Sequence, residues 1–237
     1  MSGLWEQAMS TLDQSRSFDL LLTLLAYQLG LWAYRRSGGN PLLLPVWVGL
    51  VLVVACNLLL GRDYATYAQG TAAISALLGP VIVALAIPLY QHGGPMRRQA
   101  LRVASICLAT ALVVGTAVWG TVALLAPGNA VILHSLLPKA ATTPIALEIS
   151  SALGGIPAIA ALTVMLTGIA GAMLAPPLLR GMGVRDEAAI GFALGLSAHA
   201  VGTARAFEIS SRCGAWSALG MGLMGLTLAV GLPLFLH

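Results

Sequence analysis

The sequence predicts an all-α, polytopic membrane protein, and its composition and the length of its apolar segments are the observations that predict it. Of the 237 residues, 58% are hydrophobic and only 8% are charged, whereas soluble domains average about 25% charged residues. The apolar residues form blocks of helix length, rather than the alternating strands of a membrane β-barrel. This composition excludes a water-soluble globule and an intrinsically disordered chain.

The apolar residues form eight candidate segments. In chain order they are Phe18–Tyr34, Pro41–Gly61, Tyr67–Tyr90, Leu101–Leu125, Ile132–Leu153, Ile156–Leu179, Ala188–Glu208 and Ala215–Leu236. The links between them are too short for a separate soluble domain, so we expect one integral membrane domain over residues 1–237. Within it, residues 1–130 hold the N-terminal spans, and residues 131–182 and 188–237 form two repeat units.

Basic residues lie between the segments rather than on a continuous surface. The formal net charge is +4, and the arginines cluster at 35–36, 97–102 and 180–185, so they are topology signals and not a nucleic-acid site. If all three clusters are cytoplasmic, counting the crossings leaves Ile132–Leu153 entering and leaving on the outer side. We therefore expect this segment to be re-entrant.

An internal repeat links two of the segments. TPIALEISS (residues 143–151) and TARAFEISS (residues 203–211) share six of nine residues at an offset of 60, and Lys139 then aligns with His199. If both polar segments are re-entrant, each unit crosses the membrane once and successive units are inverted, as in many secondary transporters. If both segments cross fully, the repeat is parallel and this argument weakens.

Each repeat carries polar residues in a segment where the helix is expected to break. Pro138 and Pro144 each remove a backbone N–H from the first segment, and Gly202 is the flexible point of the second. Broken backbone at membrane depth is tolerated where it is buried in protein or lines a watery cavity. The candidate substrate-binding residues are Lys139, Thr142, Thr143, His199, Thr203 and Arg205.

The spacing of these residues suits a small carboxylate. Lys139 and Thr143 are four residues apart, as are His199 and Thr203, so each pair shares a helix face. The guanidinium group of Arg205 offers a planar fork that can bind a carboxylate through two hydrogen bonds.

Each of these residues also has a structural interpretation. Arg205 is three residues from Glu208 and could form an internal ion pair with it, and Glu148 could neutralise Lys139. Alternatively, Glu148, Glu208 or His199 could carry a coupling proton. The threonines could bond back to their own helices.

Catalytic and metal-binding patterns are not apparent in the sequence. It has no H-E-x-x-H motif, no G-x-S-x-G motif and no phosphate-binding glycine loop, so we expect no enzyme activity and no cofactor. The three cysteines are far apart and form no C-x-x-C pair, so we expect no metal site.

Long stretches of the chain resemble the LrgB/CidB family of bacterial membrane proteins. They are LLPKAATTPIALEIS, GGIPA, LTGIAGAM, PPLLR and GLSAHAVGTARAFE, with LAYQLGLWAYRR, NPLLLP and LLGPVIVALAIPLY nearer the start. The sequence departs from the usual family pattern at Ala140-Ala141 and after Glu208. The family motif positions that match are Lys139, Thr142, Thr143, Pro144, Glu148, His199, Gly202, Thr203, Arg205 and Glu208.

The resemblance implies two functions. One is a carrier of small monocarboxylates, because the plastid glycolate/glycerate translocator is similar to this family. The other is an antiholin-like modulator of murein hydrolase export and cell lysis. The resemblance also implies a bacterial inner-membrane location and a small LrgA/CidA-type membrane partner, and the small-residue helix faces make a homo-oligomer plausible. The broken-helix interpretation favours a transporter of glycolate, glycerate, lactate or pyruvate.

Overall fold

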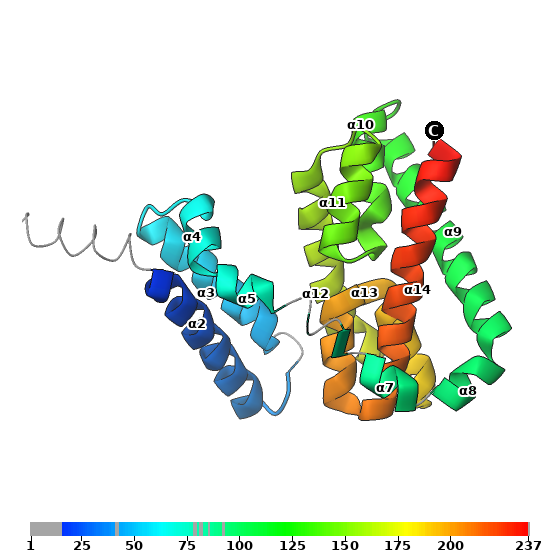
Figure 1. Cartoon of the computed structure of the whole chain (residues 1–237), viewed down its shortest axis with the longest axis horizontal. Coiled ribbons are helices and arrows are strands. Elements are labelled where there is room, and N and C mark those ends of the chain that lie inside the picture. The colour runs from blue at the N-terminus through cyan, green and yellow to red at the C-terminus, as the bar shows by residue number, and fades with distance from the viewer. Residues whose placement is uncertain are drawn as a thin grey trace, which may run out of the picture. The chain divides into compact units, whose positions relative to one another are not determined.

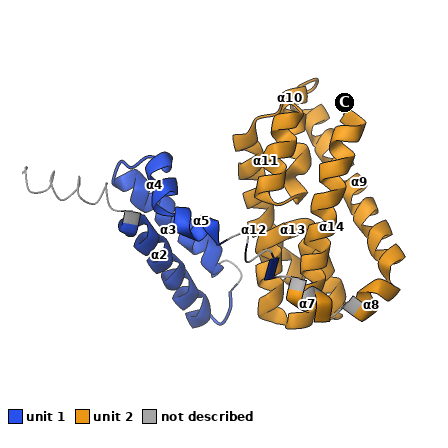
Figure 2. Ribbon diagram, viewed as in Figure 1, with its two compact units in different colours: residues 1–84 blue, residues 85–237 orange. Residues whose placement is uncertain are grey.

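The computed structural model describes residues 16–40, 43–77, 80, 83–84, 86–91 and 93–236, and these residues contain helices but no strand. The chain divides into two compact units, Met1–Ala84 (unit 1) and Leu85–His237 (unit 2), which Figure 2 distinguishes by colour. The predicted all-α class is therefore confirmed. The two units are described separately below.

Unit 1 is built on two helices that pack against each other, α2 (Arg16–Arg36) and α3 (Pro45–Leu59), followed by the shorter α4 (Tyr64–Gly70) and α5 (Ala72–Ala76). Pro45 lies in the first turn of α3, where its missing N–H costs nothing. Gly61, with φ of 64°, follows the C-cap residue Leu60, so the helix ends before it. The helix is therefore shorter than the predicted segment Pro41–Gly61, whose first two residues lie outside the described part.

A buried ion pair joins the parts of unit 1. Nη2 of Arg62 lies 3.0 Å from Oδ2 of Asp19, and the two side chains are only 5% and 1% exposed. Arg62 also stacks over the ring of Phe18, 4.9 Å from its centre, and Thr23 on α2 lies 2.9 Å from the hydroxyl of Tyr67 on α4. These contacts fix the first half of α2 against the α3–α4 connection.

Unit 2 contains the longest apolar helices of the described chain. Its elements are α7 (Ala86–Gln91), α8 (Gly93–Arg98), α9 (Ala100–Leu125), α10 (Ala130–Leu136), the 3₁₀ turn η2 (Leu137–Ala140), α11 (Thr143–Ala152), α12 (Pro157–Gly181), α13 (Glu187–Ile209) and α14 (Ser211–Leu236). Three helices of the described residues, α9, α12 and α14, are long and apolar enough to cross a membrane.

These three helices correspond to three of the eight predicted segments. The fifth and seventh predicted segments are instead broken, at η2 and within α13. The described part of the third, Tyr67–Tyr90, consists of short helices. Of the eight predicted apolar segments, two of which were expected to be broken, the described residues form three long apolar helices, and the count of eight is not confirmed.

The fifth predicted segment folds into a hairpin, which we call hairpin 1 (residues 130–153: α10, η2 and α11). The imidazole Nδ1 of His134 donates a hydrogen bond to the carbonyl oxygen of Leu153 over 2.6 Å. The backbone N–H of Ile156 bonds the hydroxyl of Ser135 at 2.7 Å. The start and the end of the segment therefore lie side by side at the N-terminal end of α12, and η2 forms the tip.

The seventh predicted segment, α13, also folds back on itself, and we call it hairpin 2. His199 has φ of 38° and ψ of −126°, a conformation that residues other than glycine rarely adopt, and it divides the helix into two limbs. The hydroxyl of Ser210, just after α13, bonds Glu187 at its start. Hairpin 2 therefore opens at the C-terminal end of α12, and Figure 1 shows α11 and α13 in different halves of unit 2.

The first limb of α13 lies against α14 with almost no side chain between the two backbones. A Cβ atom added to Gly191 would lie 2.0 Å from the carbonyl oxygen of Cys213, and one added to Gly195 would lie 2.0 Å from that of Ser217. Gly220 on α14 lies similarly close to the backbone carbonyl of Phe192 on α13. Glycine is required at these positions because any side chain would push the helices apart.

We expect Gly195→Ala to destabilise unit 2 by about 1–3 kcal/mol, the usual cost of forcing extra atoms into a close-packed site. The measurement is thermal unfolding in detergent. Gly222→Ala, on the same helix pair but with no atom within 4 Å of the added Cβ, is the matched control and should unfold at or above the wild-type temperature. Equal unfolding temperatures for the two variants would contradict this account of the packing.

Candidate functional site

The tip of hairpin 1 is an interruption in the helix that carries Lys139. Pro138 begins the 3₁₀ turn, and the backbone of Ala141 and Thr142 is then extended. α11 starts at Thr143 with Pro144 in its first turn, and the side chain of Thr142 makes no capping hydrogen bond. The first N–H groups of α11 therefore point toward the tip without a capping side chain.

The tip of hairpin 2 lies at His199, three residues before the expected break at Gly202. Gly202 is helical, and its role is steric, because an added Cβ would lie 2.6 Å from the carbonyl oxygen of Leu194 on the opposite limb. His199 is only 3% exposed. Its ring lies against α12, where a Cβ on Gly168 would come within 2.6 Å of Cε1, and its Nε2 has no hydrogen-bond partner among the described residues.

The two tips meet inside unit 2. η2 packs against α13 as well as against α9, α12 and α14, and Ala140 and Ala141 share one buried cluster with Leu196. The ten residues of α11 rise about 15 Å, which is half of a hydrocarbon core about 30 Å thick. The return limb of α13, residues 200–209, has a similar length, so each half-helix is about half as long as a bilayer's hydrocarbon core is thick.

Both half-helices begin at these tips. α11 runs from Thr143 back to the mouth of hairpin 1, and residues 200–209 run from the break back to the mouth of hairpin 2. The N-terminus of a helix carries a partial positive charge and unpaired N–H groups. Each of these ends favours an anion, and Lys139 lies four residues before one of them while His199 begins the other.

The remaining candidate residues lie farther along the return limbs or on their surface. Arg205 forms an ion pair with Glu208, and their side chains are 17% and 41% exposed, so the structure contains the internal pairing that the spacing allowed. Thr203 is buried and lies 2.9 Å from the hydroxyl of Ser217 on α14. Glu148 is exposed on α11, five residues beyond the start of this half-helix at Thr143.

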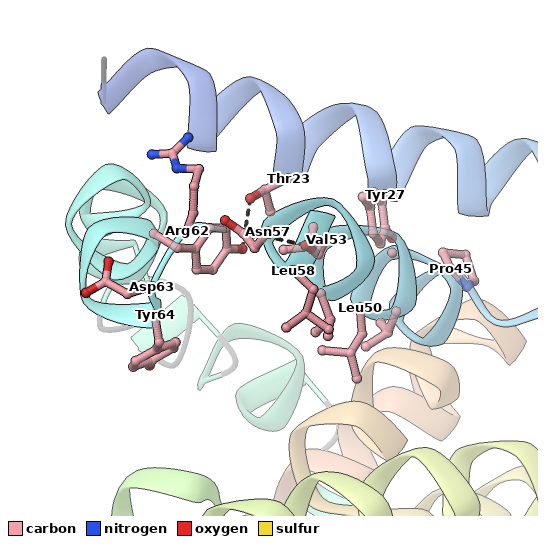
Figure 3. Close-up of a pocket in the computed structure, with 14 residues that line it drawn as sticks. Thr23, Tyr27, Pro45, Leu50, Val53, Asn57, Leu58, Arg62, Asp63 and Tyr64 are labelled. Atoms are coloured by element: carbon pink, nitrogen blue, oxygen red, sulfur yellow. Dashed lines mark hydrogen bonds between the residues drawn. The ribbon is translucent and has the colours of Figure 1, made fainter. Parts of the chain in front are cut away.

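Unit 1 has a groove of its own, and none of the candidate residues lines it. It has a volume of about 470 Å³ and is lined mainly by apolar side chains of α2 and α3. Figure 3 shows Leu50, Val53 and Leu58 beside it, with Thr23 and Asn57 at the more polar end. Apolar grooves on a membrane protein accommodate lipid or another helix as readily as a solute, so the groove does not identify a carboxylate site.

Three polar contacts important to the hairpins were missed by sequence reasoning. They involve His134, Ser135 and the pair formed by Glu187 and Ser210. The repeat already contained Ser210, and its copy-to-copy identity with Ser150 was the available signal. Among the described residues, no group of three or more His, Cys, Asp or Glu side chains is placed to hold a metal ion.

Comparison with known proteins covers nearly the whole chain. An uncharacterised protein of Haemophilus influenzae is 34% identical over 216 residues, which are 90% of this chain and 91% of that protein. YxaC of Bacillus subtilis, also uncharacterised, is 34% identical over 205 residues (86% and 88%). A protein of Bacillus mycoides named antiholin-like protein LrgB is 31% identical over 225 residues (92% and 95%).

No solved structure was found to match the chain. The LrgB-like family matches residues 23–237, a range that includes the whole of unit 2 up to its end and most of unit 1. With its three apolar helices, two broken hairpins and relatives along the full length, this chain is a membrane protein that belongs to the LrgB-like family.

Proposed function

We propose that the protein is a secondary transporter of small monocarboxylates of the glycolate, glycerate, lactate or pyruvate type across the bacterial inner membrane. The observation that supports it best is the contact of η2, which leads into the half-helix α11, with α13, whose return half-helix begins at the break at His199. A helix N-terminus favours an anion because of its dipole and its free N–H groups. A small carboxylate has the charge and the size for such a place.

Lys139 and His199 are assigned to the carboxylate, and Thr142 and Thr143 to a neighbouring hydroxyl or keto oxygen. Lys139 is half-buried in η2. Its positive charge and the partial positive charges of the half-helix N-termini would be compensated by a bound anion. Thr203 and Arg205 complete the candidate set, since they lie on the return limb that begins at His199. Because Arg205 is paired with Glu208, its contact with substrate requires that ion pair to open.

The two hairpins are attached to opposite ends of α12, and this arrangement supports a transport cycle. Hairpin 1 opens beside the start of α12 and hairpin 2 beside its end, and the 25 residues of α12 rise about 37 Å. If α12 crosses the bilayer, the hairpins enter from opposite faces and the repeat is inverted, which is an architecture that permits alternating access. His199, Glu148 and Glu208 are the residues that could carry a coupling proton.

The test is counterflow of labelled glycolate in proteoliposomes containing the purified protein. We expect saturable exchange that unlabelled glycerate, lactate or pyruvate inhibits and that an uncharged analogue such as ethylene glycol does not. Protein-free liposomes give the background rate. Exchange at that background rate with every monocarboxylate of the panel would contradict the proposal.

A second candidate function comes from the names of relatives. Antiholin-like protein LrgB of Bacillus mycoides is similar over 92% of this chain, which favours a modulator of murein hydrolase export and cell lysis working with a small LrgA/CidA-type membrane protein. Such a protein needs no substrate cycle of its own. Unselective leakage of small solutes from the same proteoliposomes, changed by co-reconstituting the small partner, would favour this function over transport.

A further inference from the structure

Hairpin 1 is closed at its mouth by a fully buried serine. The hydroxyl of Ser135 on α10 donates to the carbonyl of Val131 at 2.6 Å and accepts the N–H of Ile156 at 2.7 Å. Ile156 is the residue just before α12. A Cβ on Gly155 would lie 2.8 Å from the backbone nitrogen of Ser135, so the turn before α12 is pressed directly against the entering limb.

Hairpin 2 is closed by a different serine in a comparable place. The hydroxyl of Ser210 accepts the N–H of Cys213 at 3.0 Å and donates to the carboxylate of Glu187 at 2.7 Å. Ser210 therefore caps α14 and, through the same oxygen, joins the end of α13 to its beginning. The neighbouring ion pair of Arg212 and Asp186 spans 3.2 Å, but both side chains are more than half exposed, so it adds little.

The hydrogen bonds of the two serines lie at the far ends of the half-helices whose starts form the tips. Ser135, on α10, binds Ile156 just after α11, and Ser210 directly follows residues 200–209. A hydrogen-bonded helix of about ten residues is a stiff rod, so its far end fixes where its near end lies. Binding geometry is sensitive to displacements of about 1 Å. A half-helix released at the mouth would slide along its axis and withdraw its N–H groups from the shared tip.

We infer that Ser135 and Ser210 are positioning residues: they fix the depth of the two half-helices and so hold the anion site at the tips together. The role of the site rests on the proposed function, whereas the fixing of depth does not. Ser210 is the better residue to test, because it is half-buried and its replacement leaves no cavity in the protein interior.

The first experiment compares Ser210→Ala and Glu187→Ala with Ser210→Thr and Glu187→Gln. Threonine keeps the hydroxyl, and glutamine keeps an acceptor oxygen without the charge. We expect both alanine variants to raise the KM of glycolate counterflow about two- to tenfold, the value of one hydrogen bond, with the maximal rate unchanged. The conservative variants should restore the wild-type KM, which a loss of folded protein would not allow.

The second experiment measures hydrogen exchange of the backbone amides in detergent, without any substrate. Ser210→Ala should speed exchange in residues 200–209 and in the first turn of α14, which loses its cap, and leave α9 unchanged. Wild-type exchange rates in residues 200–209 of this variant would overturn the inference, as would an unchanged KM. If the wild-type protein exchanges no glycolate, the proposed function fails, and the amide measurement alone decides whether Ser210 fixes the return limb.

Discussion

Replacing Lys139 with alanine is expected to lower the exchange of glycolate in proteoliposomes about ten- to a hundredfold. Lys139 lies in η2, at the tip where α13 contacts hairpin 1, and a hydrogen bond to a charged group contributes about 1.5–3 kcal/mol. Removing the ammonium group also leaves Arg205, which is paired with Glu208, as the cation of the candidate set. The measurement is the initial rate of counterflow at fixed protein density.

The matched control is Lys139→Arg, which keeps the charge in a different shape and should retain part of the activity. Lys139→Met keeps the aliphatic length without the charge and should behave as alanine does. All three variants are first checked for wild-type thermal stability in detergent. A stable Lys139→Ala protein that exchanges glycolate at the wild-type rate would remove Lys139 from the site.

Replacing Asp19 with alanine is expected to destabilise unit 1 by about 3–5 kcal/mol, the usual cost of removing one partner of a buried ion pair. Its partner Arg62 has only 5% of its side chain exposed, so water cannot replace the lost carboxylate. Because the ion pair joins α2 to the α3–α4 connection, unit 1 should lose its packing before unit 2.

The three free cysteines can report on the unfolding of each unit. Cys56 is on α3 of unit 1, whereas Cys107 and Cys213 are buried in unit 2. During heating, the thiol of Cys56 should react with a maleimide at a lower temperature in Asp19→Ala than in the wild type, and the other two thiols should not. The double variant Asp19→Ala with Arg62→Met removes both charges and should recover much of the stability. Reaction of Cys56 at the wild-type temperature in the single variant would refute this role of the pair.

The sequence predicted the helices whose apolar pattern is continuous. α9, α12 and α14 coincide with segments expected from length and hydropathy, because a long apolar run has no other way to satisfy its backbone in lipid. This holds even though α12 contains Pro176 and Pro177 and α14 contains Pro233. Pro138 likewise marked the interruption before Lys139. These are local properties, and they can be read from neighbouring residues.

Features that depend on contacts between distant residues were not predictable in the same way. The break in α13 was expected at Gly202, but it lies at His199, and Gly202 serves the close approach of the two limbs. Asp19 and Arg62 are 43 residues apart, and their pairing follows from the packing of α2 against the α3–α4 connection. The ion pair of Arg205 with Glu208, in contrast, was one of two interpretations that local spacing offered.

The backbone contact between the first limb of α13 and α14 has a mechanical consequence. Gly191, Gly195 and Gly220 leave no compressible layer of side chains between these helices, so neither can slide past the other without breaking contact. The first limb of α13 and α14 must therefore move together as one rigid body. The transport cycle proposed above would therefore need its movement at another contact, and the contact of the His199 ring with Gly168 on α12 is one such place.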